Sequence, residues 1–191
     1  MQHLYGRPRY SEDALLDVLS RLWQIKVRSV ELLDAWAASA KDFEIKSGLR
    51  AQLNDERRHV RLLAEELKRR GYRHANTLDF VVSKAFALVQ AQPNDVFKVC
   101  AFHRGIKGLT RERCYRLIPV VDGRLAELLQ QILHDEDRHL RWADIRLARS
   151  LSGEGIRQCN ALLQKMGEAS EAMWSKPWRR LTMSRLSYLS S

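Results

Sequence analysis

The sequence predicts an all-α protein, a four-helix bundle of two antiparallel helical hairpins joined by a long helical crossover, with an extra C-terminal helix. Apolar residues recur at helical spacing along most of the chain, and alternating strand patterns are scarce. Only nine glycines and four prolines interrupt the 191 residues. This length suits one domain with a sizeable core. We therefore expect a single domain over residues 1–191, with the bundle at about 11–151 and a C-terminal helix and basic tail at about 153–191.

The first hairpin should consist of two long helices. A Ser-Glu-Asp sequence at residues 11–13 starts a helix that runs to about Lys41. Asp42 is suited to cap the second helix, because its carboxylate can accept from the free amides of the first turn. That helix should end near Arg70, where Gly71 can adopt the conformation that stops a helix.

The crossover must carry the chain from one end of the bundle to the other. Thr77 or Asp79 opens a helical segment that ends before Pro93. The connecting residues, 72–92, are long enough to span the bundle when mostly helical. A long connection between the second and third bundle helices is a known bundle topology.

The second hairpin should repeat the first. An Asn-Asp pair at residues 94–95 begins a helix that runs to about Ile118, where Pro119 breaks it. Asp122 caps the next helix, which reaches about Leu151. A further helix is expected over residues 155–174.

Two similar strings carry the chemistry of this sequence. Residues 55–59 read D-E-R-R-H, and residues 135–139 read D-E-D-R-H. On a helix, each string places its Glu and its His on the same face. Each string also has a lone Glu upstream at nearly equal distance, 25 residues for Glu31 and 24 residues for Glu112.

Hairpin geometry predicts that these groups meet. The helix from Glu31 to the turn near Asp42 is about 18 Å long at 1.5 Å per residue, and the helix from this turn back to Glu56 is slightly longer. The same arithmetic holds for Glu112 and Glu136. A four-helix bundle with four carboxylates and two imidazoles at one level can hold two metal ions. The predicted metal ligands are Glu31, Glu56, His59, Glu112, Glu136 and His139.

Charge and ligand type indicate which metal ions the predicted site would bind. Two divalent ions would neutralise four buried carboxylates, which would otherwise be very unfavourable. Carboxylate and imidazole ligands suit iron or manganese, and the lack of thiolates argues against structural zinc. We expect Glu56 and Glu136 to bridge two iron ions, with manganese as the alternative. Asp55 and Asp135 precede the histidines by four residues, so they either orient the imidazoles or face solvent.

The pattern Glu, ExxH, Glu, ExxH resembles the ferritin-like di-iron carboxylate superfamily over about residues 11–151. This resemblance implies a dinuclear iron or manganese centre that reacts with dioxygen or peroxide. Glu112-Arg113, the Leu-Ile-Pro sequence at 117–119 and the D-E-D-R-H string together resemble one branch, the bacterial hydroxylases of methylthio-isopentenyl-adenosine in tRNA. That likeness covers about residues 110–140 and implies a modified tRNA adenosine as substrate, with an external electron donor.

Small residues mark a candidate substrate cavity. Ala35 and Ala38 follow Glu31 by four and seven residues, and Gly105 and Gly108 precede Glu112 by seven and four. They could line a cavity beside the metals, or they could permit close helix–helix approach. Tyr115, one turn after Glu112, is a candidate catalytic residue that could bind a ligand or donate an electron. The alternative, which the sequence favours, is an ordinary core or groove tyrosine.

The chain has a formal net charge of +10, which favours polyanionic partners. No apolar run is long enough to span a membrane, and the N-terminus lacks a secretory signal, so we expect a cytoplasmic protein. The basic residues gather in two clusters. They are Arg57, Arg58, Arg61, Lys68, Arg69, Arg70 and Arg73, and then Lys176, Arg179, Arg180 and Arg185.

Three functions remain open from the sequence. The first is an oxygen-activating di-iron oxidoreductase, a hydroxylase or related oxidase acting on an organic substrate, with tRNA as a candidate. The second is ferritin-like or rubrerythrin-like iron handling or peroxide scavenging, although cage-forming ferritins usually have acidic surfaces. The third is a metal-free helical protein that binds nucleic acid. We expect a monomer or dimer.

Overall fold

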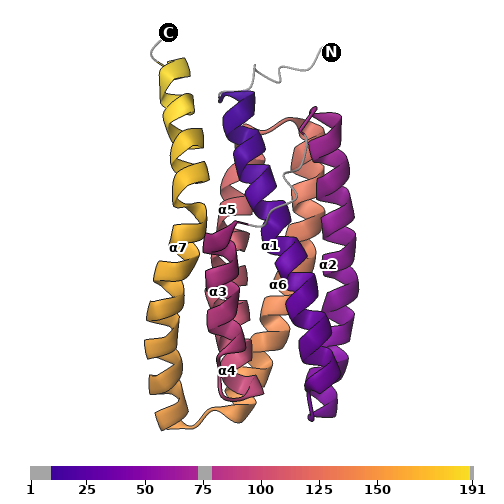
Figure 1. Cartoon of the computed structure of the whole chain (residues 1–191), viewed down its shortest axis with the longest axis vertical. Helices are drawn as coiled ribbons and strands as arrows, with labels where there is room; N and C mark the ends of the chain where they lie inside the picture. Colours follow the sequence, from indigo (N-terminus) through magenta and orange to yellow (C-terminus); the bar gives the residue numbers. More distant parts are fainter. Residues whose placement is uncertain (1–9, 73–78, 190–191) are drawn as a thin grey trace.

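The computed structural model describes residues 10–72 and 79–189, without the side chains of residues 185–189. The described residues form helices and connecting turns, with no strand among them (Figure 1). The elements are α1 (Glu12–Ser39), α2 (Phe43–Arg69), α3 (Phe80–Gln90), α4 (Asp95–Val99), the π-helix η1 (Cys100–Lys107), α5 (Gly108–Leu117), the 3₁₀-helix η2 (Ile118–Val120), α6 (Gly123–Ser150) and α7 (Gly153–Leu189).

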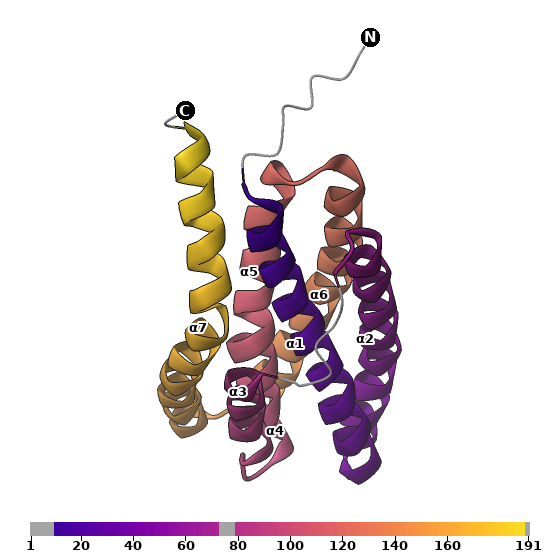
Figure 2. The same ribbon diagram turned by 45° about the horizontal axis from the view of Figure 1, so that its top comes forward.

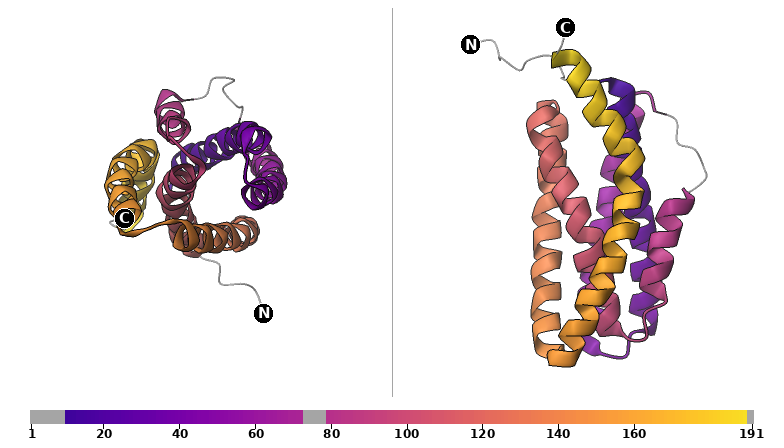
Figure 3. Two further views of the ribbon diagram at one scale, coloured as in Figure 1. Left: turned by 90° about the horizontal axis from the view of Figure 1, so that it is seen from below. Right: turned by 90° about the vertical axis from the view of Figure 1, so that its left-hand side faces the viewer.

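Two hairpins enclose the interior, as the sequence predicts. Seen along the bundle, α1, α2, α6 and the continuous α4–η1–α5 segment surround a common centre (Figure 3, left). Both long second helices begin at their expected caps, because Asp42 accepts from the amide of Ile45 and Asp122 from that of Leu125. These caps satisfy amides that the first helical turn leaves free.

Helices α3 and α7 lie outside this ring, side by side with α1 and η1 (Figures 1 and 2). Asp79 caps α3 through the amide of Val81, and Thr77, the other predicted start, lies outside the described residues. The expected end of the last helix at Trp174 is wrong, because α7 continues through Pro177. Pro177 lacks an amide donor, but it is buried beside the buried Trp174 and Leu181. Apolar burial offsets the broken helical hydrogen bond.

The helix predicted from residue 94 to Ile118 is not uniformly α-helical. It opens into the π-helix η1, whose winding differs from the α-helix on either side. Gly105 and Gly108 weaken the preference for α-helix in this stretch. The buried face of η1 carries two polar side chains, His103 and Lys107.

The described helices include none that is both long enough and apolar enough to cross a membrane.

Candidate functional site, a buried lysine–carboxylate–histidine centre

The two repeated strings meet in the middle of the bundle. Helix α2 presents Glu56 and His59, and α6 presents Glu136 and His139, each pair three residues apart on one helical face. All four side chains are at most 2% exposed. The sequence therefore locates correctly the four groups that the strings supply.

Two lysines complete the centre. Lys26 comes from α1 and Lys107 from η1, and both are buried. The Lys26 ammonium donates to Glu136, and its Nζ lies 3.2 Å from Oε2 of Glu56. The Lys107 ammonium donates to Glu56 and to Oε2 of Glu136 at 2.9 Å. Each ammonium group therefore bridges the same two carboxylates.

The imidazoles are held by aspartates from the opposite helix. His59 Nε2 lies 2.9 Å from Oδ2 of Asp135, and His139 Nε2 lies 3.0 Å from Oδ2 of Asp55. An ionised carboxylate can only accept, so each Nε2 carries the proton. Asp55 and Asp135 thus orient imidazoles, but across the α2–α6 interface rather than within their own strings.

Two arginines cover these aspartates on the solvent side. Arg58 donates to Asp135 and, at 3.1 Å, to Asp55. Arg138 donates to Asp55 at 2.6 Å and to Asp135 at 3.0 Å. Both guanidinium side chains are about half exposed, whereas the aspartates they cover are nearly buried.

The local charges stabilise one another. Burial alone would raise the pKa of Glu56, but Lys107 and Lys26 outweigh burial and hold that pKa well below its usual range. The same opposing effects lower the pKa of Glu136. Burial would lower the pKa of Lys26, yet the two carboxylates raise it above its ordinary value. Lys26 and both glutamates are therefore charged.

The pKa of His59 is raised as well. Burial opposes its protonation, but the hydrogen bond to Asp135 and the proximity of Glu56 outweigh that effect. His59 Nδ1 lies 3.6 Å from Oε2 of Glu56, and Nδ1 has no hydrogen-bond partner among the described residues. A proton on Nδ1 would let the imidazole donate toward this carboxylate.

A second sequence repeat underlies the two lysines. Residues 25–31 read I-K-V-R-S-V-E and residues 106–112 read I-K-G-L-T-R-E, so both contain I-K-x-x-[ST]-x-E. The hydroxyls of Ser29 and Thr110 each donate, at 2.9 Å, to the carbonyl four residues earlier. Sequence reasoning missed Lys26 and Lys107, although this repeat would have revealed them.

The predicted ligands Glu31 and Glu112 are not in the centre. Glu31 is half exposed and paired with Arg28, and Glu112 is similarly exposed and paired with Arg116. A residue five positions beyond a buried lysine points about 140° away from it around the helix. The level also differs, because Lys26 and Glu56 are each fifteen residues from Lys41 at the turn, whereas Glu31 is only ten.

The other predicted site residues also lie elsewhere. Tyr115 is 47% exposed, and the Arg111 guanidinium lies 4.7 Å from its ring centre, so it lies at the surface rather than in the buried centre. Ala35 and Ala38 are exposed on α1. A Cβ at Gly105 would come within 2.8 Å of the Met166 Cβ on α7.

That contact supports close helix approach at Gly105, the alternative to a cavity. At Gly108, a Cβ would meet the His103 carbonyl oxygen at 3.7 Å, an ordinary contact. The four small residues therefore do not line a common substrate cavity.

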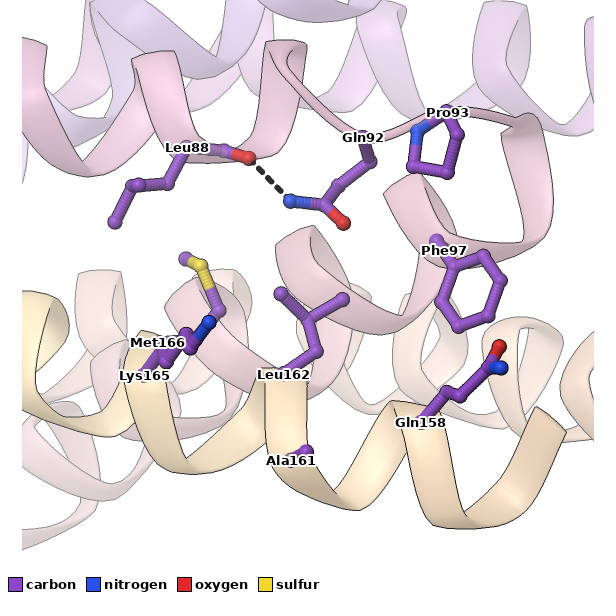
Figure 4. Close-up of a pocket in the computed structure, with 9 residues that line it drawn as sticks. All are labelled: Leu88, Gln92, Pro93, Phe97, Gln158, Ala161, Leu162, Lys165 and Met166. Atoms are coloured by element: carbon purple, nitrogen blue, oxygen red, sulfur yellow. Dashed lines mark hydrogen bonds between the residues drawn. The ribbon is translucent and has the colours of Figure 1, made fainter. Parts of the chain in front are cut away.

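An apolar groove does exist between α7 and the α3–α4 connection (Figure 4). Its volume is about 450 Å³, and the Gln92 amide at its edge donates to the Leu88 carbonyl at 2.7 Å. None of the centre's side chains lines it. The groove therefore offers a ligand no contact with the buried carboxylates.

Glu56, Glu136 and His139 could hold a metal ion, because one ligand atom from each lies within 4.8 Å of the others. The space among these three ligand atoms is where Nζ of Lys107 lies, 3.1 Å from Nδ1 of His139. The dinuclear set predicted from the sequence does not fit, since two of its four carboxylates face solvent and two ammonium groups lie in the interior.

Comparisons with protein-family models, with curated proteins and with solved structures found no match to this chain.

Proposed function

We propose that this chain is a helical RNA-binding protein that uses the exposed face of α2 and needs no metal for binding. The observation that carries the proposal is a row of four basic residues, Arg50, Arg57, Arg61 and Lys68, all exposed. Their spacings of seven, four and seven residues keep them within about 40° of one another around the helix. The row extends over roughly 27 Å.

Most of this charge is free to meet phosphate. Arg57 lies 3.4 Å from Asp34, a weak and exposed pair. Within the described part of the chain, Arg50, Arg61 and Lys68 have no carboxylate within ion-pair distance. One acid, Glu65, is exposed on the same side of α2. The net charge of +10 adds a long-range attraction for a polyanion.

The row borders a groove that could receive bases. Between α1 and α2, a groove of about 670 Å³ is flanked by Arg57 and Arg61, and its other lining residues are Val27, Val30, Glu31, Asn54 and Val60. Guanidinium planes are suitable platforms for unstacked bases, while the outer cations can contact phosphates. This combination favours single-stranded or looped RNA over a rigid duplex.

The burial of the centre argues against turnover of an organic substrate there. Its two glutamates, two histidines and two lysines are at most 3% exposed, so an organic substrate has no access to them in this conformation. The chain then has a ferritin-like topology, which the repeated hairpins and the crossover support. In this reading, the centre stabilises the bundle and the surface of α2 recognises the partner.

Salt dependence of binding tests the proposal. Four phosphate contacts on a single strand predict a slope of about −2.8 for log K against log salt concentration, at ~0.7 per contact. Fluorescence anisotropy with a labelled tRNA and a labelled single-stranded RNA would measure it. Replacing Arg50, Arg61 and Lys68 with Gln should reduce the slope to about −0.7.

A matched control removes the same charge elsewhere. The residues Arg141, Arg149 and Lys165 are exposed on other helices and should tolerate replacement with Gln without a comparable change in slope. Equal losses in both triple variants would show that binding follows net charge alone, and the α2 face would then have no special role.

A second candidate is the metal-dependent oxidoreductase that the sequence resemblance implies, with dioxygen or peroxide, an organic substrate and an electron donor. The grouping of Glu56, Glu136 and His139 favours it. A bound iron ion would supply redox chemistry, and these three side chains would hold it. Anaerobic iron loading followed by oxygen should then produce a ferric absorption band, which Glu136→Ala should abolish.

A further inference from the structure

The two buried lysines occupy the interior positions of the helices that should have supplied the outer carboxylate ligands. Lys26 and Lys107 come from α1 and from η1, the two bundle segments that carry no D-E-x-R-H string. We infer that their ammonium groups replace the two divalent cations that this carboxylate–histidine arrangement would otherwise need. The native centre is then metal-free and held by lysine–glutamate pairs.

The charge count supports this replacement. In the inner layer, two glutamates face two lysines, and in the outer layer, two aspartates face two arginines. With neutral imidazoles the cluster has no net charge, and protonation of His59, whose pKa is raised, would make it positive. Two added divalent ions would bring four further positive charges into the interior, where uncompensated charge is strongly unfavourable.

The geometry leaves no separate place for an ion. Nζ of Lys107 contacts Glu56, Glu136 and His139 at once, which are the three side chains that could serve as ligands. A metal ion bonds such ligands at about 2.0–2.2 Å, so it would have to occupy the space of the ammonium group. Expelling Lys107 would leave a long cationic side chain without its partners.

The replacement is present in both halves of the molecule. The two lysines are 81 residues apart, and the two glutamates are 80 apart, so each hairpin contributes one Lys and one Glu. Near each lysine a hydroxyl donates to the carbonyl four residues earlier, from Ser29 in α1 and from Thr110 in α5. A neutral centre requires both lysines, and the repeat supplies both.

The first test uses the unmodified protein. Purified chain is dialysed anaerobically against Mn²⁺ or Fe²⁺, its metal content is measured by mass spectrometry, and its thermal unfolding is followed with and without EDTA. We expect no stoichiometric metal and the same midpoint in every condition. Bound metal at one or more ions per chain would overturn the inference if it raised the midpoint and was lost in Glu56→Gln.

The second test restores the missing ligands. Lys26→Glu combined with Lys107→Glu supplies four inner carboxylates, and this variant should bind about two Mn²⁺ ions per chain. Because its metal-free form has uncompensated carboxylates, it is refolded with Mn²⁺ and its helical circular dichroism is recorded. Recovery of helix that depends on Mn²⁺ supports the inference. A helical double variant that binds no metal would contradict it.

A matched control separates the two predicted ligand sets. Adding Glu31→Gln and Glu112→Gln to the double variant should leave its metal content unchanged, because these side chains face solvent. Loss of metal in this control would return both residues to the ligand set and overturn the inference. The RNA experiment is independent, since it measures binding at the surface of α2 and not the occupancy of the buried centre.

Discussion

Replacing Lys107 with methionine should strongly destabilise the bundle. Methionine fills a similar volume without a charge, so the change isolates the ammonium group. Lys107 donates to both central glutamates, and after its loss Lys26 alone must balance them. One negative charge would then remain uncompensated among side chains that are at most 3% exposed.

The size of the effect follows from burial. Removing one partner of a buried ion pair typically destabilises a protein by about 3–5 kcal/mol. For a domain of this size, each kcal/mol lowers the melting temperature by about 2–4 °C. We therefore expect Lys107→Met to lower the midpoint by roughly 6–20 °C.

A double-mutant cycle shows whether charge balance is the cause. Glu136→Gln alone leaves a positive charge in excess and should also destabilise. Combined with Lys107→Met it restores balance, because one lysine then faces one glutamate. The double variant should be less destabilised than the sum of the single changes by about 1–3 kcal/mol, measured by urea unfolding.

Exposed glutamates provide the control. Glu31→Gln and Glu112→Gln remove only surface pairs and should change the free energy of unfolding by less than about 1 kcal/mol. Charge balance is not the cause if these changes destabilise the protein as much as Lys107→Met, or if the cycle with Glu136→Gln shows strict additivity.

Two further predictions concern η1. Burial and the nearby Lys107 lower the pKa of His103 to about 3. The neutral imidazole therefore contributes stability above the unfolded-state pKa near 6.5, and this stability is lost as the pH falls toward 3. His103→Gln should make the free energy of unfolding depend less on pH in that window. Gly105→Ala should destabilise by about 1–3 kcal/mol, because its Cβ meets Met166, whereas Gly167→Ala, with open space, should stabilise by up to about 1 kcal/mol, as thermal unfolding can show.

Much of the fold could be predicted from local patterns. Asp42, Asp79 and Asp122 cap helices as expected, because a cap depends on a carboxylate and the few amides that follow it. The π-helix and the extension of α7 through Pro177 could not be predicted in this way. Both depend on packing against other helices, which outweighs local propensity.

The sequence by itself determined that two D-E-x-R-H strings lie on equivalent helices and bring Glu56, His59, Glu136 and His139 together. A repeated, three-residue spacing on paired hairpins has few other solutions. Only the tertiary structure decided which upstream residue joins them, because Lys26 and Glu31 recur with the same offset as Lys107 and Glu112. Helical phase and hairpin register turn the lysines inward and the glutamates toward solvent, and this difference makes a predicted metal centre into a lysine–carboxylate one.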